Sequence, residues 1–349
     1  MRAAGTLAPV TEVSTLLQSI GVTGEPLLSA LPGGRNNRLY QVQSGGHSWI
    51  AKAYFRDPDH PQQRQTVEWR FLAWADSRGI RCVPKPIACD LASGVSLLEF
   101  VDGSPIIPGQ VTHLDLAAAS DFFRDLQPPV HSRPQLPEAS EACWTLESHR
   151  ELVAARVARL AALSPHDEIG ADCLEFVLRE LQPRLLESIR VFDRQVGQWQ
   201  LSLATELSVL QRSLSPSDFG YHNALRMPNG RICFVDFEYA GWDDPAKLVC
   251  DFFCQPRVPA PRESAQSFME MIGGLVSDER ALTGRVHALW PLYQVKWCCI
   301  VLNEFLQSAA NRREFADSTW DADAQRHRQL QLARTLLEKW TPEWPPSPN

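Results

Sequence analysis

The sequence predicts an α+β protein whose two parts differ in secondary structure. From about residue 27 to residue 100, short apolar runs alternate with turn residues, a pattern typical of antiparallel strands. After Gly103, apolar residues recur at helical spacing over long stretches, which predicts amphipathic helices. With 349 residues and 44% hydrophobic content, the chain can bury a large core and divide into two lobes. We therefore expect a small β-sheet lobe over residues 1–100 and a larger, mainly helical lobe over residues 101–349.

A lysine and a glutamate in the first part of the chain are expected to form an ion pair. Lys52 stands in the middle of an apolar run over residues 48–53, which predicts a strand carrying one charged side chain. Glu68 lies at the edge of the apolar face of a helix predicted over residues 65–74. The Glu68 side chain can therefore point into the interior, toward Lys52. The alternative is that both residues are solvated surface charges.

The same patterns predict the remaining elements. An apolar strand running into a glycine turn is expected over residues 94–103, and Asn229-Gly230 is a strong signal for a two-residue turn between strands. Further helices are expected over residues 11–20, 114–126, 146–163, 174–192, 263–275, 280–306 and 322–340.

Three polar residues carry most of the functional information. Asn223 follows Asp218 by five residues, and Asp236 stands at the end of the next apolar strand. Phosphoryl transfer from ATP uses one Asp to orient the acceptor hydroxyl, with an Asn and a second Asp to hold Mg²⁺. The spacing therefore predicts Asp218 as the catalytic residue and Asn223 and Asp236 as the metal ligands.

The string Asp218-Phe219-Gly220 permits another interpretation, because Asp-Phe-Gly marks the metal-binding Asp of protein kinases. In that case a catalytic Asp followed by an Asn should lie upstream. Residues 193–217 contain no Asn and no Asp other than Asp193. The downstream pattern fits instead, so we assign Asp218 to catalysis.

With these motifs the chain resembles the aminoglycoside phosphotransferase and choline kinase superfamily, whose fold is similar to that of protein kinases. The resemblance covers about two thirds of the chain. That family usually has His-Gly-Asp at the start of the catalytic loop, where this chain has Pro216-Ser217-Asp218. The histidine normally braces the loop, so its absence means that another part of the chain must do so.

The resemblance also implies how ATP is bound. The segment around Gly33 and Asn36 resembles the phosphate-covering hairpin of the family, and residues 48–53 match the strand whose lysine contacts the phosphates. The backbone near Glu99 would pair with adenine as a hinge; an ordinary strand and turn is the alternative. The implied nucleotide-binding residues are Gly33, Gly34, Asn36, Asn37, Lys52, Glu68, Glu99 and Val101.

In this superfamily the late helices form much of the acceptor pocket. Lys296, Trp297 and Glu304 are candidates because polar groups inside so apolar a helix need a reason. The alternative is that Trp297 packs in the core while Lys296 and Glu304 reach solvent. Tyr221 and His222, which lie between the catalytic Asp and the Asn, are also expected to face the acceptor.

Two further acidic residues follow the predicted metal ligand. Asp244 precedes Pro245, and an Asp cap followed by Pro is typical of a helix start. We therefore expect Asp244 to be mainly structural. Asp251 is expected either to brace the catalytic loop or to be an exposed helical residue.

Composition excludes several function classes. The net charge of −7, without Lys/Arg runs, argues against nucleic acid as the main partner. No early segment has the apolar length of a membrane span or the core of a signal peptide, so a cytoplasmic location without a membrane is the default. Nine cysteines without a Cys-x-x-Cys pair predict small buried hydrophobic residues rather than a zinc site.

The predicted function is an ATP- and Mg²⁺-dependent kinase acting on a hydroxyl of a small molecule, such as a sugar, amino sugar, aminoglycoside or amino alcohol. A nucleotide-binding pseudokinase acting as a scaffold is the alternative, because the loop histidine is missing. A protein kinase is disfavoured, since residues 237–245 leave no room for a long activation segment.

Overall fold

The computed structural model describes residues 8–32, 36–56, 63–129, 132–307, 313, 315–316 and 321–345. Two compact units divide the chain, and each is described by itself. The first unit takes residues 1–104, 225–239 and 311–320, and the second takes residues 105–224, 240–310 and 321–349. The predicted lobe boundary at residue 100 stays a prediction.

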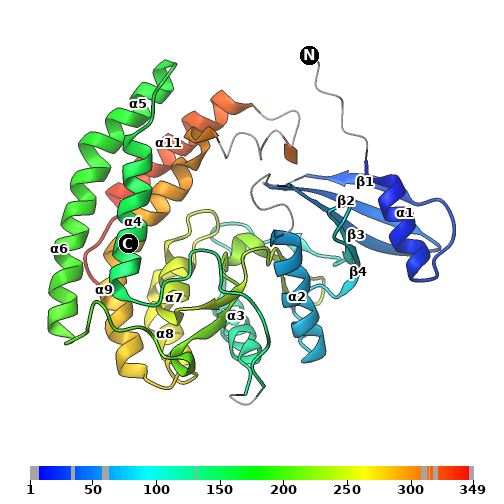
Figure 1. Cartoon of the computed structure of the whole chain (residues 1–349), viewed down its shortest axis with the longest axis horizontal. Coiled ribbons are helices and arrows are strands. Elements are labelled where there is room, and N and C mark those ends of the chain that lie inside the picture. Colours follow the sequence, from blue (N-terminus) through cyan, green and yellow to red (C-terminus); the bar gives the residue numbers. More distant parts are fainter. Residues whose placement is uncertain are drawn as a thin grey trace. The chain divides into compact units, whose positions relative to one another are not determined.

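The first unit contains a five-stranded antiparallel sheet in the order β1-β2-β3-β5-β4 (Figure 1). Its strands are β1 (Leu27–Leu31), β2 (Asn37–Ser44), β3 (His47–Tyr54), β4 (Pro86–Asp90) and β5 (Val95–Glu99). Gly45 and Gly46 join β2 to β3 with φ values of 56° and 78°. Glycine adopts these positive values easily because it has no Cβ. These two glycines therefore form the tight turn of the β2–β3 hairpin.

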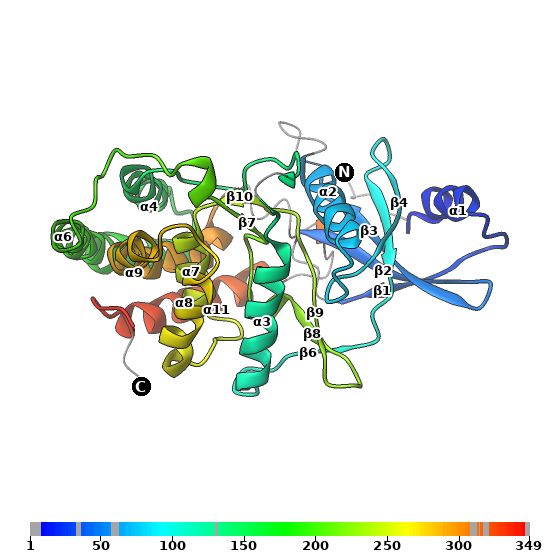
Figure 2. The same ribbon diagram turned by 90° about the horizontal axis from the view of Figure 1, so that it is seen from below.

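Helices cover both faces of this sheet, and strand alternation decides which residues each helix meets (Figure 2). Ala51 and Leu97 point to the face where helix α1 (Val10–Ser19) packs, in one apolar cluster with Leu16. Successive side chains of a strand point to opposite faces. Lys52 therefore points to the other face, where helix α2 (Gln63–Ser77) lies.

The second unit is mainly helical, as predicted. Its helices in the described residues are α3 (His113–Leu126), α4 (Leu146–Ala161), α5 (Glu168–Phe176), α6 (Gln182–Gln198), α7 (Pro245–Cys254), α8 (Ala265–Gly273), α9 (Glu279–Val301) and α11 (Ala322–Glu338). The helix expected over residues 174–192 is divided by a π-helical turn, Val177–Leu181, between α5 and α6.

Helix α9 is central to the second unit, because it packs against α4, α6, α7 and α11. Trp290 and Tyr293 of α9 are fully buried. The buried indole of Trp290 donates a hydrogen bond from Nε1 to Thr341 Oγ1 at 3.2 Å. Because neighbouring helices cover α9 on several sides, most of its side chains are buried and can be apolar.

Short strands hold the segments that precede and follow the two predicted functional Asp residues. Strands β6 (Ser104–Pro105), β8 (Ala224–Arg226) and β9 (Ile232–Phe234) form one small sheet. Strands β7 (Ser213–Ser215) and β10 (Gly241–Asp243) pair antiparallel in another. The predicted strand that ends near Asp236 is confirmed as β9, and Gly230 in the preceding turn has a φ of 81°.

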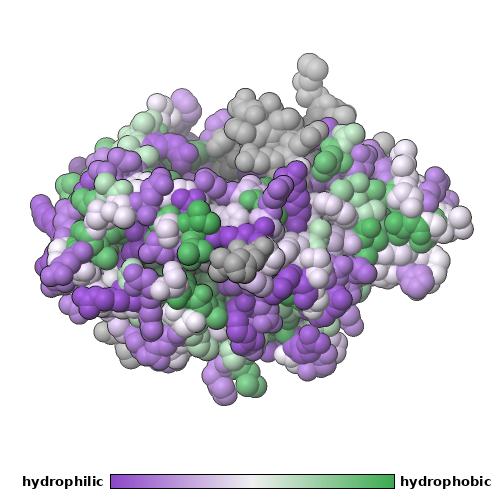
Figure 3. Space-filling model, turned by 60° about the horizontal axis from the view of Figure 1, so that its bottom comes forward, coloured by the Kyte–Doolittle hydropathy of each residue, from purple (hydrophilic) through white to green (hydrophobic). Residues whose placement is uncertain are grey.

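The hydropathy of the surface and of the helices bears on whether the described residues could span a membrane. On the face shown in Figure 3, hydrophilic residues cover most of the surface and hydrophobic residues form scattered patches. Within the part of the chain that the structure describes, no helix is both long enough and apolar enough to cross a membrane. The cysteines are free, and most are buried, as predicted.

An aromatic cluster in the second unit packs beneath the catalytic-loop residues Phe219 and Tyr221. Phe252 of α7 stacks on Phe268 of α8 with ring centroids 4.6 Å apart. The same ring lies 5.3 Å from Phe219 and 5.4 Å from Tyr221. Aromatic pairs at such distances add stability beyond the area they bury. Phe252 therefore joins two helices to the catalytic loop.

We expect Phe252→Ala to lower the free energy of unfolding by about 3–5 kcal/mol, because it removes a large buried ring and leaves a cavity. Leu114→Ala is the control: Leu114 is 70% exposed, and its loss should change stability by less than about 0.5 kcal/mol. Urea unfolding of both variants measures the difference. A loss below about 1 kcal/mol for Phe252→Ala would contradict the packing role of this ring.

Candidate active site

Lys52 is the centre of a buried ionic cluster in the first unit. Its Nζ lies 2.6 Å from Glu68 Oε2 and 2.6 Å from Asp236 Oδ1. Strand β3 supplies the lysine and helix α2 the glutamate, while Asp236 follows β9. The predicted Lys52–Glu68 ion pair is confirmed, and the alternative that both are surface charges is wrong because both side chains are buried.

Two carboxylates, Glu68 and Asp236, face the single ammonium group of Lys52 in this cluster. Burial alone lowers the pKa of Lys52, but the carboxylates of Asp236 and Glu68 together raise it well above its usual value. The ammonium group therefore stays charged although it is buried. In a nucleotide-binding site, a charged ammonium group of this kind would attract phosphate oxygens.

Glu68 accepts hydrogen bonds from two further groups besides Lys52. Tyr54 donates its hydroxyl hydrogen to Glu68 Oε2 at 2.6 Å, and the backbone N–H of Phe237 donates to Oε1 at 3.0 Å. Tyr54 was not identified from the sequence. Its position two residues after Lys52 on the same strand was the available signal, because residues i and i+2 share a face.

Asp236 has a left-handed backbone conformation. Its φ is 70°, a left-handed value that costs a non-glycine residue about 1–2 kcal/mol. Its side chain is 39% exposed, and among the described residues only Oδ1 has a partner. Strained residues cluster at functional sites. The carboxylate thus keeps Oδ2 available for a ligand.

A second polar cluster surrounds Glu238, which sequence reasoning did not single out. Its carboxylate accepts hydrogen bonds from Asn37 Nδ2 at 2.6 Å and Asn36 Nδ2 at 2.9 Å, and Arg64 Nη1 lies 3.5 Å away. The two asparagines were expected to cover the nucleotide, and that role stays a prediction. Their side chains fasten the start of β2 to the segment that follows Asp236.

The structure gives fewer contacts for the other residues predicted to bind the nucleotide. Gly33 and Gly34 lie outside the described residues. Glu99 ends β5, and its backbone N–H donates to Lys85 O at 2.9 Å while its carboxylate accepts from Lys85 N at 3.0 Å. Val101 follows β5 and is half-buried. Pairing of this segment with adenine stays a prediction.

The predicted catalytic loop belongs to the second unit and is organised around Asp218. His222 Nε2 lies 3.0 Å from Asp218 Oδ1. Asn223 Nδ2 donates to the backbone oxygen of Asp218 at 3.0 Å and to Oδ2 at 3.3 Å. Partial burial works to raise the pKa of Asp218, but the contacts with His222 and Asn223 lower it overall. The carboxylate is therefore ionised at neutral pH.

Asn223 and Asp236 have the right chemistry for Mg²⁺. With its amide nitrogen bound to Asp218, Asn223 keeps Oδ1, which accepts no hydrogen bond within the described ranges. Mg²⁺ prefers oxygen ligands and commonly uses one or two carboxylates together with substrate phosphates. No group of three or more His, Cys, Asp or Glu side chains suited to a metal occurs in the described part of the chain.

Ser217 replaces the glycine that the family usually has before its catalytic Asp. Its φ is 66°, in the left-handed region that favours glycine. Its backbone N–H donates to Ser215 Oγ at 3.0 Å. The loop therefore keeps a glycine-like backbone shape with a serine, at some cost in strain.

The residues expected to contact the acceptor are buried. Lys296 Nζ lies 3.0 and 2.9 Å from the two carboxylate oxygens of Asp251, and Trp297 Nε1 donates to the same carboxylate at 2.8 Å. Lys296 is 3% exposed and Glu304 5%, so the alternative that they reach solvent is wrong. Tyr221 is fully buried. Acceptor binding by these residues stays a prediction, and their packing does not support it.

Asp251 is buried, so the expectation that it is an exposed helical residue is also wrong. Its carboxylate neutralises Lys296, and Lys247 Nζ lies 3.8 Å from it. A role as a brace of the catalytic loop stays a prediction. What the structure shows is a tie between α7 and α9 within the second unit.

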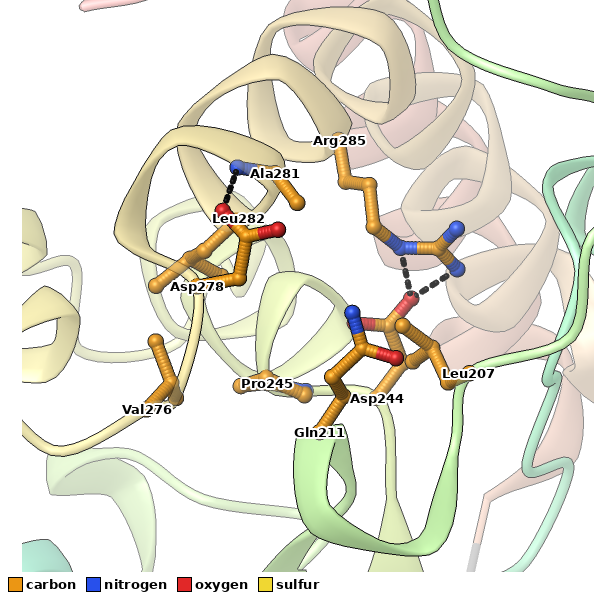
Figure 4. Close-up of a pocket in the computed structure, with 9 residues that line it drawn as sticks. All are labelled: Leu207, Gln211, Asp244, Pro245, Val276, Asp278, Ala281, Leu282 and Arg285. Carbon is orange, nitrogen blue, oxygen red and sulfur yellow. Dashed lines mark hydrogen bonds and ion pairs between the residues drawn. The ribbon is translucent and has the colours of Figure 1, made fainter.

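Asp244 is structural, as predicted. It caps α7 by accepting a hydrogen bond from Ala246 N at 2.8 Å. His149 Nε2 lies 3.0 Å from its Oδ2, and Arg285 donates to the same oxygen from Nε at 2.9 Å. Figure 4 shows the guanidinium of Arg285 turned toward this carboxylate beside a small pocket at the starts of α7 and α9.

The sequence pattern of the family described as "Phosphotransferase enzyme family" matches residues 28–266. The chain belongs to this family. The match spans Lys52, Glu68, Asp218, Asn223 and Asp236. Among curated proteins none matches. Membership of a family of phosphotransferase enzymes does not support the pseudokinase alternative.

Solved structures share the fold of this phosphotransferase. A choline/ethanolamine kinase family protein from Mesorhizobium loti is 17% identical, with 94% of this chain and 93% of that chain covered and a TM-score of 0.57. A spectinomycin phosphotransferase in complex with ADP and spectinomycin is 13% identical, with 93% and 100% covered and a TM-score of 0.58. An ethanolamine kinase from Plasmodium vivax is 13% identical, with 96% and 86% covered and a TM-score of 0.55.

These similarities confirm the predicted α+β, protein kinase-like fold and the resemblance to the aminoglycoside phosphotransferase and choline kinase superfamily. The sequence identities are low, so the fold is what the solved structures share with this chain.

We expect Ser217→Gly to keep or raise the stability of the phosphotransferase, by up to about 1 kcal/mol, because glycine adopts a positive φ without strain. Ser217→Val is the matched contrast and should lower stability by about 1–2 kcal/mol, because a β-branched side chain tolerates this conformation least. Thermal and urea unfolding measure both. A loss above about 1 kcal/mol for Ser217→Gly would mean that the serine side chain, rather than the backbone shape, is needed here.

Proposed function

We propose that this chain is an ATP-dependent kinase that transfers the γ-phosphate of ATP to a hydroxyl of a small molecule. The observation that supports it most is the pairing of Lys52 Nζ with both Glu68 and Asp236 at 2.6 Å. Protein kinases depend on an ion pair between a strand lysine and a helix glutamate, together with an Asp that binds Mg²⁺, to position the phosphates. Family membership supports phosphotransferase chemistry independently.

In this proposal the first unit holds the nucleotide. Lys52 contacts the α- and β-phosphates, while Glu68 keeps the ammonium group in place through its bonds with Lys52, Tyr54 and the Phe237 backbone. Asp236 and Asn223 would hold Mg²⁺, since each has a side-chain oxygen without a hydrogen-bond partner among the described residues. When bound, Mg²⁺ neutralises charge on the phosphates and on the departing ADP.

Asp218 acts on the acceptor. Its carboxylate accepts a hydrogen bond from the acceptor hydroxyl and takes its proton as the hydroxyl oxygen attacks the γ-phosphorus. The bond between the γ-phosphorus and the β,γ-bridging oxygen breaks, and ADP leaves with that electron pair. The lowered pKa of Asp218 keeps it ionised and ready to orient the hydroxyl, although it makes the residue a weak base.

The acceptor belongs to the sugars, amino sugars, aminoglycosides or amino alcohols. Relatives of similar fold are named for choline or ethanolamine, for spectinomycin and for amicoumacin, which are all hydroxylated small molecules. The net charge of −7 favours such a partner over nucleic acid. Relatives solved with ADP, AMP or AMP-PNP support the use of ATP.

The test is ATP turnover by the purified chain with Mg²⁺ against a panel of these four acceptor classes. We expect ADP and a phosphorylated product with at least one acceptor, and no product when Mg²⁺ is removed with EDTA. Titration of ATP in the presence of Mg²⁺ is the second measurement. Failure to bind the nucleotide would overturn the proposal.

Separate roles for the two Asp residues predict different defects. Asp218→Asn should leave ATP affinity near that of wild type and slow transfer by about 10²- to 10⁴-fold, the usual loss for a general base. Asp236→Asn should abolish transfer by weakening Mg²⁺ binding, which raises the Mg²⁺ concentration needed for any remaining activity. Steady-state kinetics with Mg²⁺ titration measure both. Full activity of Asp218→Asn would show that the catalytic residue is assigned wrongly.

Loss of the buried ion pair should affect the nucleotide step. We expect Lys52→Ala to weaken productive ATP binding or to lower kcat by at least about 10²-fold, because a charge aimed at the phosphates is lost. Glu68→Ala should do less, because the lysine remains with Asp236 as a partner. The exposed Lys339→Ala and Glu338→Ala are matched controls and should behave as wild type. Equal kinetics for Lys52→Ala and Lys339→Ala would contradict the phosphate role.

A further inference from the structure

We propose that His222 is the positioning residue for Asp218 and takes over the bracing role of the histidine that the family places before its catalytic Asp. This inference rests on the proposed kinase function and changes the role expected for His222, which was contact with the acceptor. Pro216 stands where the family histidine would be, and its side chain has no hydrogen-bonding group. The loop therefore needs a brace from another position.

The geometry of His222 suits this role. Its Nε2 lies 3.0 Å from Asp218 Oδ1, and its side chain is only 4% exposed. A carboxylate at neutral pH can only accept, so Nε2 carries the hydrogen and donates. The other ring nitrogen, Nδ1, is buried and has no hydrogen-bond partner among the described residues. The bond to Asp218 is thus the polar contact that holds the ring.

Space for this imidazole is made by Gly220. A Cβ at residue 220 would stand 2.8 Å from His222 Nδ1 and 3.2 Å from Gln255 Cγ, both closer than ordinary contact. The φ of Gly220 is 166°, an extended value that any residue adopts. Glycine is therefore required for room, and not for its backbone conformation. This is a second, independent sign that the loop is shaped around the histidine.

His222 and Asn223 act on different oxygens of one carboxylate. They are consecutive residues of the short 3₁₀ turn Tyr221–Asn223, so their side chains leave the backbone in different directions. His222 binds Oδ1, and Asn223 reaches Oδ2 at 3.3 Å and the backbone oxygen at 3.0 Å. Together they fix the rotamer of Asp218. The ring of Tyr221 packs against Phe252 of α7 and so holds the turn in place.

A fixed carboxylate matters because transfer requires the acceptor hydroxyl in line with the phosphorus. An error of about 1 Å in such a placement costs about 10²-fold in rate. Groups that orient metal-ligating side chains typically contribute 10- to 100-fold to affinity or activity, and we expect a similar factor for a group that orients a catalytic carboxylate. Loss of His222 should therefore lower kcat and leave nucleotide binding almost unchanged.

The experiment compares His222→Ala and His222→Gln with wild type, using MgATP and an acceptor that wild type phosphorylates. For His222→Ala we expect kcat to fall about 10- to 100-fold, with KM for ATP within about twofold. For His222→Gln we expect most of the rate to return, because its amide nitrogen can replace Nε2 as the donor. The exposed His327→Ala is the control and should retain the wild-type rate.

A double-mutant cycle separates positioning from general damage to the fold. Once Asp218→Ala has removed the carboxylate, adding His222→Ala should slow the remaining rate by less than about twofold, because no hydrogen-bond acceptor is left to position. If His222→Ala fails to fold, Gly220→Ala gives the same test by displacing the ring, and His222→Gln supplies the folded comparison. Thermal unfolding and ATP titration verify that each variant is native.

Three outcomes would overturn the inference: a wild-type kcat for His222→Ala, an equal loss in the Asp218→Ala background, or a folded His222→Gln as slow as His222→Ala. Each of these leaves the proposed function standing, because wild type still phosphorylates the acceptor. The proposed function fails separately, if wild type itself neither binds MgATP nor yields product.

Discussion

The arrangement of the first unit depends on one constraint: the buried ammonium group of Lys52 must be paired with carboxylates. Lys52 meets it with Glu68 and Asp236, which come from a helix and from a strand end far away in the sequence. Removing one partner of a buried pair typically costs about 3–5 kcal/mol, because the remaining charge is left uncompensated. The same charge that orders the unit is the one that phosphates can attract, so stability and proposed function share one group.

The catalytic loop of the second unit depends on different forces. Aromatic packing around Phe252 supports it, and hydrogen bonds from His222 and Asn223 orient Asp218. Left-handed backbone at Ser217, like that at Asp236, shows that the chain accepts local strain beside the two carboxylates to which we assign the proposed reaction. Packing energy elsewhere in each unit offsets this strain.

Much of the fold and the main polar residues could be predicted from the sequence, because both are recorded in local patterns. Apolar periodicity located the helices, and the Asn229-Gly230 turn located the strand before Asp236. For Lys296 and Glu304 the same patterns left two alternatives: solvent exposure is wrong because both side chains are buried, and acceptor binding stays a prediction. The carboxylate that neutralises Lys296 is Asp251, on another helix, and no local pattern indicates such a partner.

The sequence by itself determined the secondary structure, the family and the order of the functional residues, because spacing and residue type carry that information along the chain. Only the tertiary structure decided which polar groups share each charge. It paired Glu238 with Asn36 and Asn37, Lys296 with Asp251, and His222 with Asp218. The physical reason is that the energy of a buried charge depends on the partners that packing brings within about 3 Å, whatever their distance in sequence.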